Sequence, residues 1–171
     1  WASMQAGVGI RTGGGLIALD IDSTNDLIAH QAMKLAEKML GAAPHRIGRW
    51  PKAILIYRTP DIIPYMRVEF TGGKENERIE LLTEGRQFVA DGIHPGVKTP
   101  YEWPAGVLRF DKLTAVSKDQ VTAYFNELAR ILPAASKPVQ SASSSVDRAS
   151  VNQTNLTGDD ETVARAVHAL P

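Results

Sequence analysis

The short connections between strand-like segments after residue 45 constrain the fold most. Five segments there are apolar or alternate apolar with polar residues, which is typical of β-strands. Only a few residues separate one segment from the next, whereas a parallel connection needs a crossover of a dozen or more residues. We therefore expect an α+β domain built on a largely antiparallel sheet. The five segments are 46–50, 52–58, 65–70, 78–82 and 87–91.

Two further strands and two helices complete the predicted body. Residues 8–13 and 15–22 read as short strands around a run of glycines. Residues 23–40 carry apolar side chains at helical spacing, and residues 117–132 do the same, with Ser117 as the expected N-cap. The chain therefore contains few helices beside many strands, as an α+β domain requires.

Composition divides the chain into three parts. The 171 residues are 43% hydrophobic and 22% charged, which fits one globular domain with an appendage. We expect the folded body at 1–133. Residues 134–158 are rich in Ser, Ala, Asn and Gln and lack aromatic residues, which predicts a flexible linker. Residues 159–171 begin with acidic residues and continue with helical spacing, so they predict the start of a C-terminal helical module.

Charge and cysteine content exclude several classes of protein. The 19 basic and 19 acidic residues cancel, so a nucleic-acid site would have to be a local feature. The absence of cysteine excludes a disulfide framework and a thiolate zinc site. No apolar run approaches the ~18 residues of a membrane helix, and the first residues do not resemble a signal peptide. We expect a cytoplasmic protein that does not enter a membrane.

A pair of carboxylates ends the apolar segment "GLIALDIDSTN". Asp20 and Asp22 are two residues apart on a predicted strand, so they project from the same face. Their mutual repulsion would be relieved by a divalent cation such as Mg²⁺ or Mn²⁺. An ordinary strand end is the other interpretation, with both aspartates in water and Ser23 or Asp26 capping the next helix.

A third carboxylate could join this pair. Glu80 lies between Ile79 and Leu81 in a predicted strand and faces away from both. If that strand neighbours the one carrying the aspartates, three carboxylates converge, as a two-metal nucleotidyl-transfer site needs. A solvent-facing strand residue is the alternative for Glu80 alone.

Cations and an aromatic residue gather in "HRIGRWPKAILIYR". Arg46, Arg49, Lys52 and Arg58 could hold an anionic substrate, because guanidinium and ammonium groups match phosphate oxygens. Trp50 lies among them and could stack on a base. An ordinary amphipathic hairpin with basic residues in water is the alternative.

His94 is the histidine that the sequence favours most as a functional residue. It lies in the turn "GIHPG" rather than on an apolar face. Loops on a rigid scaffold often carry binding residues. A structural histidine remains the alternative.

These motifs resemble the N-terminal primase-polymerase (prim-pol) domain of the archaeo-eukaryotic primase superfamily, in the form found in phage, prophage and plasmid replication proteins. "VGIRTGGGLIALDID" is similar to the family's first strand followed by its Asp-x-Asp. "RIELLTEGRQFVADGIHPGVKTPYEW" is similar to its third motif, and the resemblance runs from about Gln5 to Trp103. It implies an archaeo-eukaryotic primase-like fold with a largely antiparallel, RRM-like sheet flanked by helices. It also implies that chain is missing before residue 1.

The resemblance implies a site and its cofactor. Asp20, Asp22 and Glu80 would be catalytic metal ligands for Mg²⁺ or Mn²⁺, and His94 would lie near the nucleotide or the metal. The family's second motif normally contains a histidine that contacts the nucleotide's phosphates, and this chain has none after His45. A branch with the pattern "RxGxxPK" fits instead, through residues Arg46, Gly48, Pro51 and Lys52.

The resulting hypothesis is a template-directed nucleotidyltransferase, a DNA primase/polymerase. Arg46, Arg49 and Lys52 would hold the triphosphate, and Trp50, Tyr101 or Trp103 would stack on a base. The partners would be nucleoside triphosphates, a single-stranded DNA template and a helicase module in the same full-length chain. The last of these is implied because 159–171 is similar to the start of a primase C-terminal module.

Two other functions fit parts of the sequence. "ALDIDST" also matches the Asp-x-Asp-x-Thr of haloacid-dehalogenase-like phosphatases, but those need a parallel sheet and a downstream acidic pair, and the only Asp-Asp here is 159–160. A non-catalytic nucleic-acid-binding or replication-assembly module with the prim-pol fold is the other alternative. The missing histidine favours that alternative, and the carboxylate triad argues against it.

Overall fold

The computed structural model describes residues 7–74, 77–107 and 109–141. Its two α-helices and eight strands follow the order expected from the sequence, with one strand added at the end. In chain order, the elements are β1 (Val8–Arg11), β2 (Leu16–Asp22), α1 (Asp26–Leu40), β3 (His45–Ile47), β4 (Ala53–Arg58), β5 (Tyr65–Phe70), β6 (Glu77–Leu82), β7 (Gln87–Asp91), the 3₁₀ turn η1 (Phe110–Lys112), α2 (Lys118–Ile131) and β8 (Val139–Ser141).

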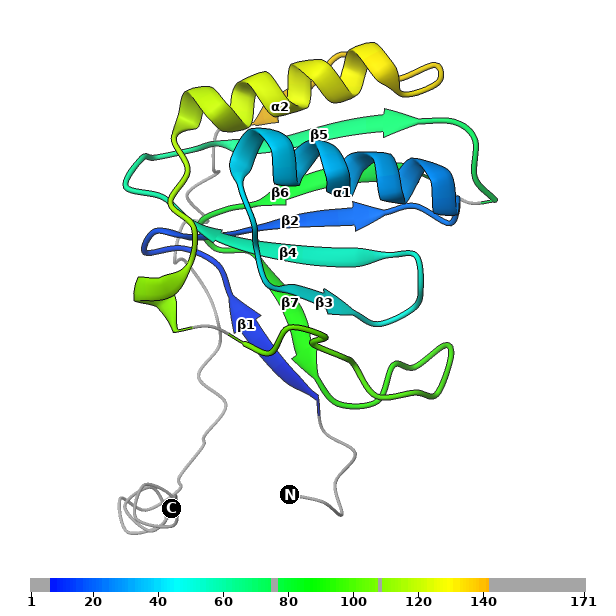
Figure 1. Cartoon of the computed structure of the whole chain (residues 1–171), viewed down its shortest axis with the longest axis vertical. Coiled ribbons are helices and arrows are strands. Elements are labelled where there is room, and N and C mark those ends of the chain that lie inside the picture. Colours follow the sequence, from blue (N-terminus) through cyan, green and yellow to red (C-terminus); the bar gives the residue numbers. More distant parts are fainter. Residues whose placement is uncertain (1–6, 75–76, 108, 142–171) are drawn as a thin grey trace, which may run out of the picture.

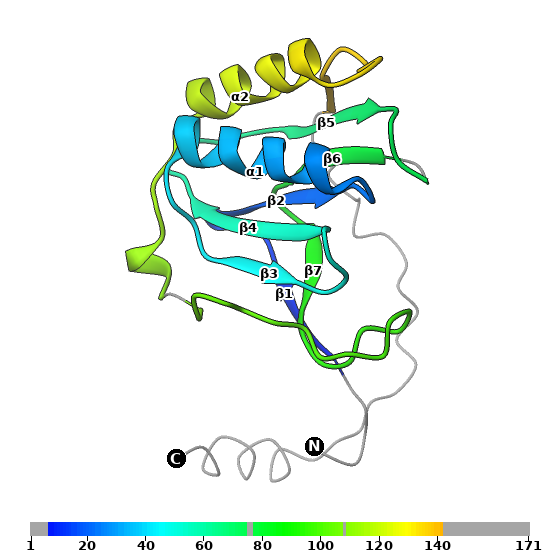
Figure 2. The ribbon, with the colours of Figure 1, turned by 45° about the vertical axis from the view of Figure 1, so that its right-hand side comes forward.

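The strands form two antiparallel sheets. The larger sheet has six strands in the order β3-β4-β2-β6-β5-β8, and β1 pairs with β7 in a separate ribbon. Figures 1 and 2 show this ribbon crossing the strands of the larger sheet at a steep angle. The predicted α+β class and the largely antiparallel sheet are therefore confirmed.

Both helices cover one face of the larger sheet (Figure 1). Alternation along β2 points Ile17, Leu19 and Ile21 into this main core, where each is almost fully buried. Tyr124 of α2 is also fully buried, and its hydroxyl donates to the Ala32 carbonyl of α1 at 3.2 Å. The helices thus pack over this face of the sheet. The β2 residues that alternate with these core residues point to the opposite face.

The opposite face is only partly covered. The β1–β7 ribbon packs over one end of it in a second core that contains Ala18 and Phe88. Asp20 and Asp22 lie further along β2, and each keeps part of its surface exposed. The fold therefore leaves the carboxyl end of β2 open beside a packed apolar base.

Thr12 joins the ribbon to the larger sheet. It is 1% exposed, and its hydroxyl donates to the Thr83 carbonyl at 2.5 Å. Its backbone N–H donates to the Arg86 carbonyl, and its carbonyl accepts from the Gly85 N–H. Glu84 extends the connection by accepting a hydrogen bond from the Gly14 N–H at 3.1 Å. The end of β1 and the turn between β6 and β7 are therefore fixed to each other.

The helix ends agree only partly with the sequence analysis. Ser117 caps α2 as predicted, in a reciprocal capping box with Gln120. The cap of α1 is Asn25, whose side chain accepts from two backbone N–H groups of the first turn, so the strand-end alternative was wrong to place the cap at Ser23 or Asp26. Ser23 is instead fully buried, and its hydroxyl oxygen accepts from the Asn25 N–H.

The chain after α2 returns to the sheet. Strand β8 pairs with β5, and the Ser136 N–H donates to the Glu69 carbonyl at 2.8 Å. This stretch belongs to 134–158, for which the sequence predicts a linker. The strand was missed because edge pairing through backbone atoms leaves little trace in side-chain composition. The rest of that segment and the helix expected at 159–171 lie outside the described residues. No helix in the described ranges is long and apolar enough to cross a membrane.

Thr12→Val tests the connection between the sheets. Valine keeps the shape of threonine but removes the buried hydrogen bond from the Thr12 hydroxyl and leaves the Thr83 carbonyl with the Arg86 N–H as its donor, so the free energy of unfolding should fall by about 1 kcal/mol. Urea denaturation measures this change. Thr122→Val, at a half-buried position in α2, is the control and should change it by less than about 0.5 kcal/mol. Equal losses in the two variants would contradict the role assigned to Thr12.

Candidate active site

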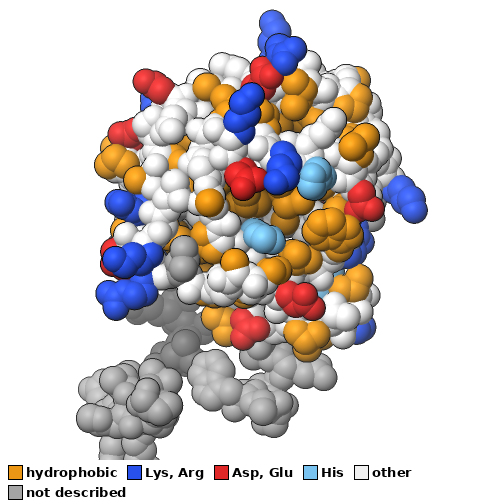
Figure 3. Space-filling view, in the orientation of Figure 1, with side chains coloured by type: hydrophobic (Ala, Val, Ile, Leu, Met, Phe, Trp, Pro, Cys, Tyr) orange, Lys and Arg blue, Asp and Glu red, His pale blue; other side chains and the backbone are white. Residues whose placement is uncertain are grey.

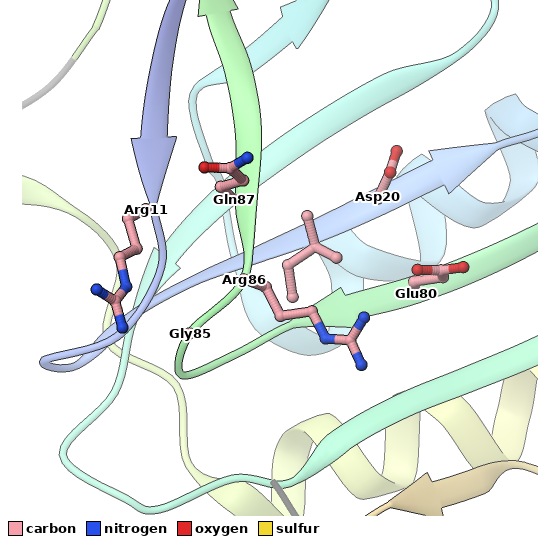
Figure 4. A pocket seen from close by; sticks show the side chains of 7 residues that line it. Arg11, Asp20, Glu80, Gly85, Arg86 and Gln87 are labelled. Carbon is pink, nitrogen blue, oxygen red and sulfur yellow. The ribbon is translucent and has the colours of Figure 1, made fainter. Parts of the chain in front are cut away.

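The pairing of β2 with β6 brings the three predicted carboxylates onto one face. Asp20 lies directly opposite Glu80 in the register of the two strands. Asp22 is two residues further along β2 and points to the same side. Figure 4 shows Asp20 and Glu80 beside each other at one end of a pocket of about 690 Å³.

Two cations lie among these carboxylates. Lys52 Nζ is 2.6 Å from Asp22 Oδ1, and Arg78 Nη2 is 3.3 Å from Asp22 Oδ2. Arg78 also reaches Glu80, with 2.5 Å between Nε and Oε1. The sequence analysis does not single out Arg78, although alternation along β6 already places it on the same face as Glu80.

Asp20 has a different environment. Among the described residues, no hydrogen bond or ion pair engages its carboxylate. Its pKa is raised from 3.8 to about 6, first because the group is buried and next because the charge of Asp22 lies nearby. Glu80 raises the pKa as well, whereas Arg46 and Arg78 lower it. Asp20 is thus a carboxylate whose charge the fold leaves poorly compensated.

This donor set fits a divalent cation chemically. Mg²⁺ and Mn²⁺ prefer carboxylate oxygens, and a cation would compensate the charge on Asp20. Within the described ranges, no three His, Cys, Asp or Glu side chains are arranged as a ready-made metal cluster. Arg78 and Lys52 engage oxygens of Asp22 and Glu80 in this structure, so a metal on these carboxylates would have to replace those ion pairs.

Arg46 is held beside the carboxylates by an aromatic ring. The backbone groups of Ile47 and Glu102 exchange hydrogen bonds of 2.8 and 2.9 Å, which ties the loop after β7 to β3. This places the Tyr101 ring 4.6 Å from the Arg46 guanidinium carbon. Gly48 is needed here because a Cβ would overlap both side chains. The Nε of Arg46 is buried without a hydrogen-bond partner among the described residues, so this cation has donor capacity to spare.

His94 belongs to the same loop and lies near Tyr101. Its Nδ1 accepts hydrogen bonds from the backbone N–H groups of Gly96 and Val97, at 3.0 and 3.3 Å. The neutral ring must then carry its proton on Nε2, which can donate to a ligand. The ring centroids of His94 and Tyr101 are 5.5 Å apart. The structure therefore brings His94 to the same edge of the site as Arg46.

The other predicted residues are distributed around this edge. Arg49 and Trp50 line a neighbouring hollow of about 330 Å³ rather than the pocket that contains Asp20. Trp50 is 57% exposed. Trp103 is half-buried against the second core, where its indole N–H donates to the Ala90 carbonyl at 2.9 Å.

Three polar residues in the main pocket escape the sequence analysis. Arg11, Arg86 and Gln87 also line it, with Arg11 at the end away from the carboxylates and the Arg86 side chain directed toward Glu80 (Figure 4). Their approach depends on the hydrogen bonds of Thr12, which join two turns far apart in the sequence. The arginines themselves were visible as isolated basic residues, but no local pattern indicated that they share a pocket with Asp20.

The comparison with known families decides the identity of the domain. Residues 1–118 match the family described as bifunctional DNA primase/polymerase, N-terminal. The chain belongs to this prim-pol family. A search of curated proteins found no match. The matched region includes every residue that the sequence analysis assigned to the site, and membership confirms the predicted resemblance.

Family membership settles the class of activity. The prim-pol domain is a DNA primase/polymerase, a nucleotidyltransferase that acts in DNA replication on a DNA template with nucleotides as substrates, and the family is divalent-metal-dependent. The phosphatase alternative is wrong, because the sheet around Asp20 is antiparallel throughout its strand pairs.

The raised pKa of Asp20 predicts a pH-dependent penalty in the metal-free prim-pol domain. Because the folded pKa is about 6 and the ordinary value is 3.8, the folded state holds its proton more tightly. With respect to this group, the folded state is therefore most stable at low pH, where Asp20 is protonated. This contribution to the free energy of unfolding is lost as the pH rises through about 6 and Asp20 becomes charged. Asp20→Asn removes the penalty, so in EDTA the variant should melt at a higher temperature than wild type at about pH 8, and the gap should shrink at about pH 5.

Thermal melts of both proteins at the two pH values measure the effect. Glu37→Gln, which removes an exposed carboxylate from α1, is the matched control and should show no comparable gap at either pH. A melting temperature of Asp20→Asn that is no higher than that of wild type at the upper pH would contradict the charge environment described for Asp20.

Proposed function

We propose that this prim-pol domain extends a nucleic-acid strand along a single-stranded DNA template, using two Mg²⁺ or Mn²⁺ ions held by Asp20, Asp22 and Glu80. The observation that carries the proposal is the register that sets Asp20 opposite Glu80, while among the described residues no ion pair engages the Asp20 carboxylate. When bound, such ions activate the 3′ hydroxyl and neutralise charge on the triphosphate.

The residues around the carboxylates would then change partners. Lys52 and Arg78 neutralise Asp22 and Glu80 when no metal is present. A divalent ion would compete with both of them for the same oxygens. In our proposal the released Lys52 turns to the phosphates of the incoming nucleotide, where an ammonium acts as a compact positive charge.

Arg46 and His94 would orient the triphosphate from the edge of the sheet. Arg46 is fixed over Tyr101 and retains an unused Nε–H, which suits a charge-assisted bond to phosphate. The Nε2–H of His94 supplies a neutral donor nearby. Together they offer a replacement for the histidine missing from the second motif, with Arg49 as a further cation at the neighbouring hollow.

Base stacking would fall mainly to Trp50. It is the most exposed of the three predicted aromatic residues, whereas Tyr101 supports Arg46 and Trp103 is anchored to the Ala90 carbonyl. A base placed on an exposed indole gains stacking energy without sequence preference. Tyr101 and Trp103 would then contribute by fixing the loop that closes this edge.

The replication context follows from the resemblance described above. We infer that the domain works in phage, prophage or plasmid replication, in the cytoplasm, within a longer chain that carries a helicase module. Residues 142–171, which would connect the two, lie outside the described ranges. The similarity of 159–171 to the start of a primase C-terminal module supports this arrangement.

Primer extension tests the catalytic proposal. Wild-type protein with Mn²⁺ or Mg²⁺, a primed single-stranded template and labelled nucleotides should give extended products. Asp20→Ala and Glu80→Gln should each lower the extension rate by about a hundredfold or more, because each removes a metal ligand. Glu127→Gln removes a carboxylate from α2 on the helical face and should leave the rate unchanged. An absence of extension with or without primer would favour the non-catalytic binding module instead.

A further inference from the structure

A second group of cationic and polar residues faces the carboxylates from the side of the β1–β7 ribbon. Arg11, Arg86 and Gln87 share the pocket of about 690 Å³ with Asp20 and Glu80. We propose that this pocket binds the phosphodiester backbone of the strand whose 3′ end is extended. The inference rests on the proposed function and adds a subsite to it.

The two arginines are carried by segments that are fixed to each other. Thr12 follows Arg11 directly, and both its backbone N–H and its hydroxyl lie within hydrogen-bond distance of the Arg86 carbonyl, the hydroxyl at 3.1 Å. The Arg86 N–H in turn donates to the Thr83 carbonyl at 3.1 Å, which closes the turn. The backbone that carries both guanidinium groups is therefore preorganised, so little ordering is needed when an anion binds.

Arg86 is also held at the level of its side chain. Its guanidinium carbon lies 4.0 Å from the centroid of the Tyr65 ring on β5. Figure 4 shows the Arg86 side chain directed toward Glu80, while Arg11 lies at the far end of the pocket. A strand entering beside Arg11 would thus pass Arg86 before it reaches Asp20 and Glu80.

The geometry of phosphoryl transfer explains why this side suits the growing strand. In an in-line displacement the attacking 3′ oxygen and the leaving pyrophosphate lie on opposite sides of the reacting phosphorus. Arg46 and Lys52 approach the carboxylates from β3 and the start of β4, and our proposal gives them the triphosphate. The pocket with Arg11 and Arg86 lies on the ribbon side, where the attacking strand has to arrive.

The lining chemistry suits a backbone more than a base. Arginine pairs with phosphate oxygens through two parallel N–H groups, and Gln87 can add a hydrogen bond without charge. Such contacts fix the position of a strand without reading its sequence. The apolar side chain of Leu82 also lines the pocket and gives sugars a surface to pack on.

Fluorescence anisotropy with two DNA probes tests the assignment. A labelled template alone and the same template annealed to a primer are titrated with the protein, with Mn²⁺ and no nucleotides. Arg11→Ala/Arg86→Ala should weaken binding of the primed template by about tenfold and make its salt dependence shallower by about 1 to 2 units of slope. Binding of the template alone and of a fluorescent non-hydrolysable nucleotide should be unchanged.

Two further variants sharpen the result. Arg130→Ala removes an exposed guanidinium from α2, on a face where charges of both signs are scattered (Figure 3), and should bind primed DNA as wild type does. Arg86→Lys keeps the charge but loses the planar fork, so its affinity should fall between wild type and Arg86→Ala.

Three outcomes would overturn the inference: unchanged binding of primed DNA, an equal loss for template alone, or a loss confined to the nucleotide. The last would make the pocket a triphosphate site. DNA binding does not require catalysis, so Arg86-dependent binding by a protein that fails to extend primers would uphold this subsite and refute only the catalytic proposal.

Discussion

The antiparallel pairing of β2 with β6 determines what this molecule can do. Its register sets Asp20 directly opposite Glu80, an arrangement in which like charges repel and weaken a sheet. The fold tolerates it because the other face of β2 is closed by the main core and because Arg78 links Glu80 to Asp22. A one-residue slip would turn the aspartates into that core and bring Leu19 and Ile21 to the open face. The apolar periodicity of β2 therefore protects the position of the carboxylates.

The cations of the site serve two states of the protein in this account. Without metal, Lys52 and Arg78 compensate two of the three carboxylates. Asp20 is the third, and its negative charge is disfavoured by burial and by the nearby charge of Asp22. A bound ion would relieve Asp20 and free those cations for anionic substrates. Arg46 differs because Tyr101 holds it in place and Gly48 leaves room for that contact. The domain thus has two kinds of cation at this site: Lys52 and Arg78 pair with carboxylates, whereas Arg46 is held by an aromatic ring.

Much of this arrangement could be predicted from the sequence. The alternation of β2 and β6 put the three carboxylates on common faces, and the short connections fixed the antiparallel class. What the sequence could not show depended on contacts between distant segments. Arg86 joins the pocket only because Thr12 holds its turn, and β8 pairs through backbone atoms with no apolar signature. The α1 cap was misplaced because several residues before the helix can cap, and only the backbone conformation at Asn25 selects one.

The central claim is that two neighbouring strands hold one cation site between them, and Mn²⁺ binding followed by electron paramagnetic resonance tests it most directly. The account predicts that wild-type protein takes up Mn²⁺ and that Glu80→Gln, altered on β6 alone, binds it about tenfold more weakly or worse. Glu127→Gln on α2 should match wild type. If Glu80→Gln bound Mn²⁺ as tightly as wild type, the two strands would not share a metal and the account would be contradicted.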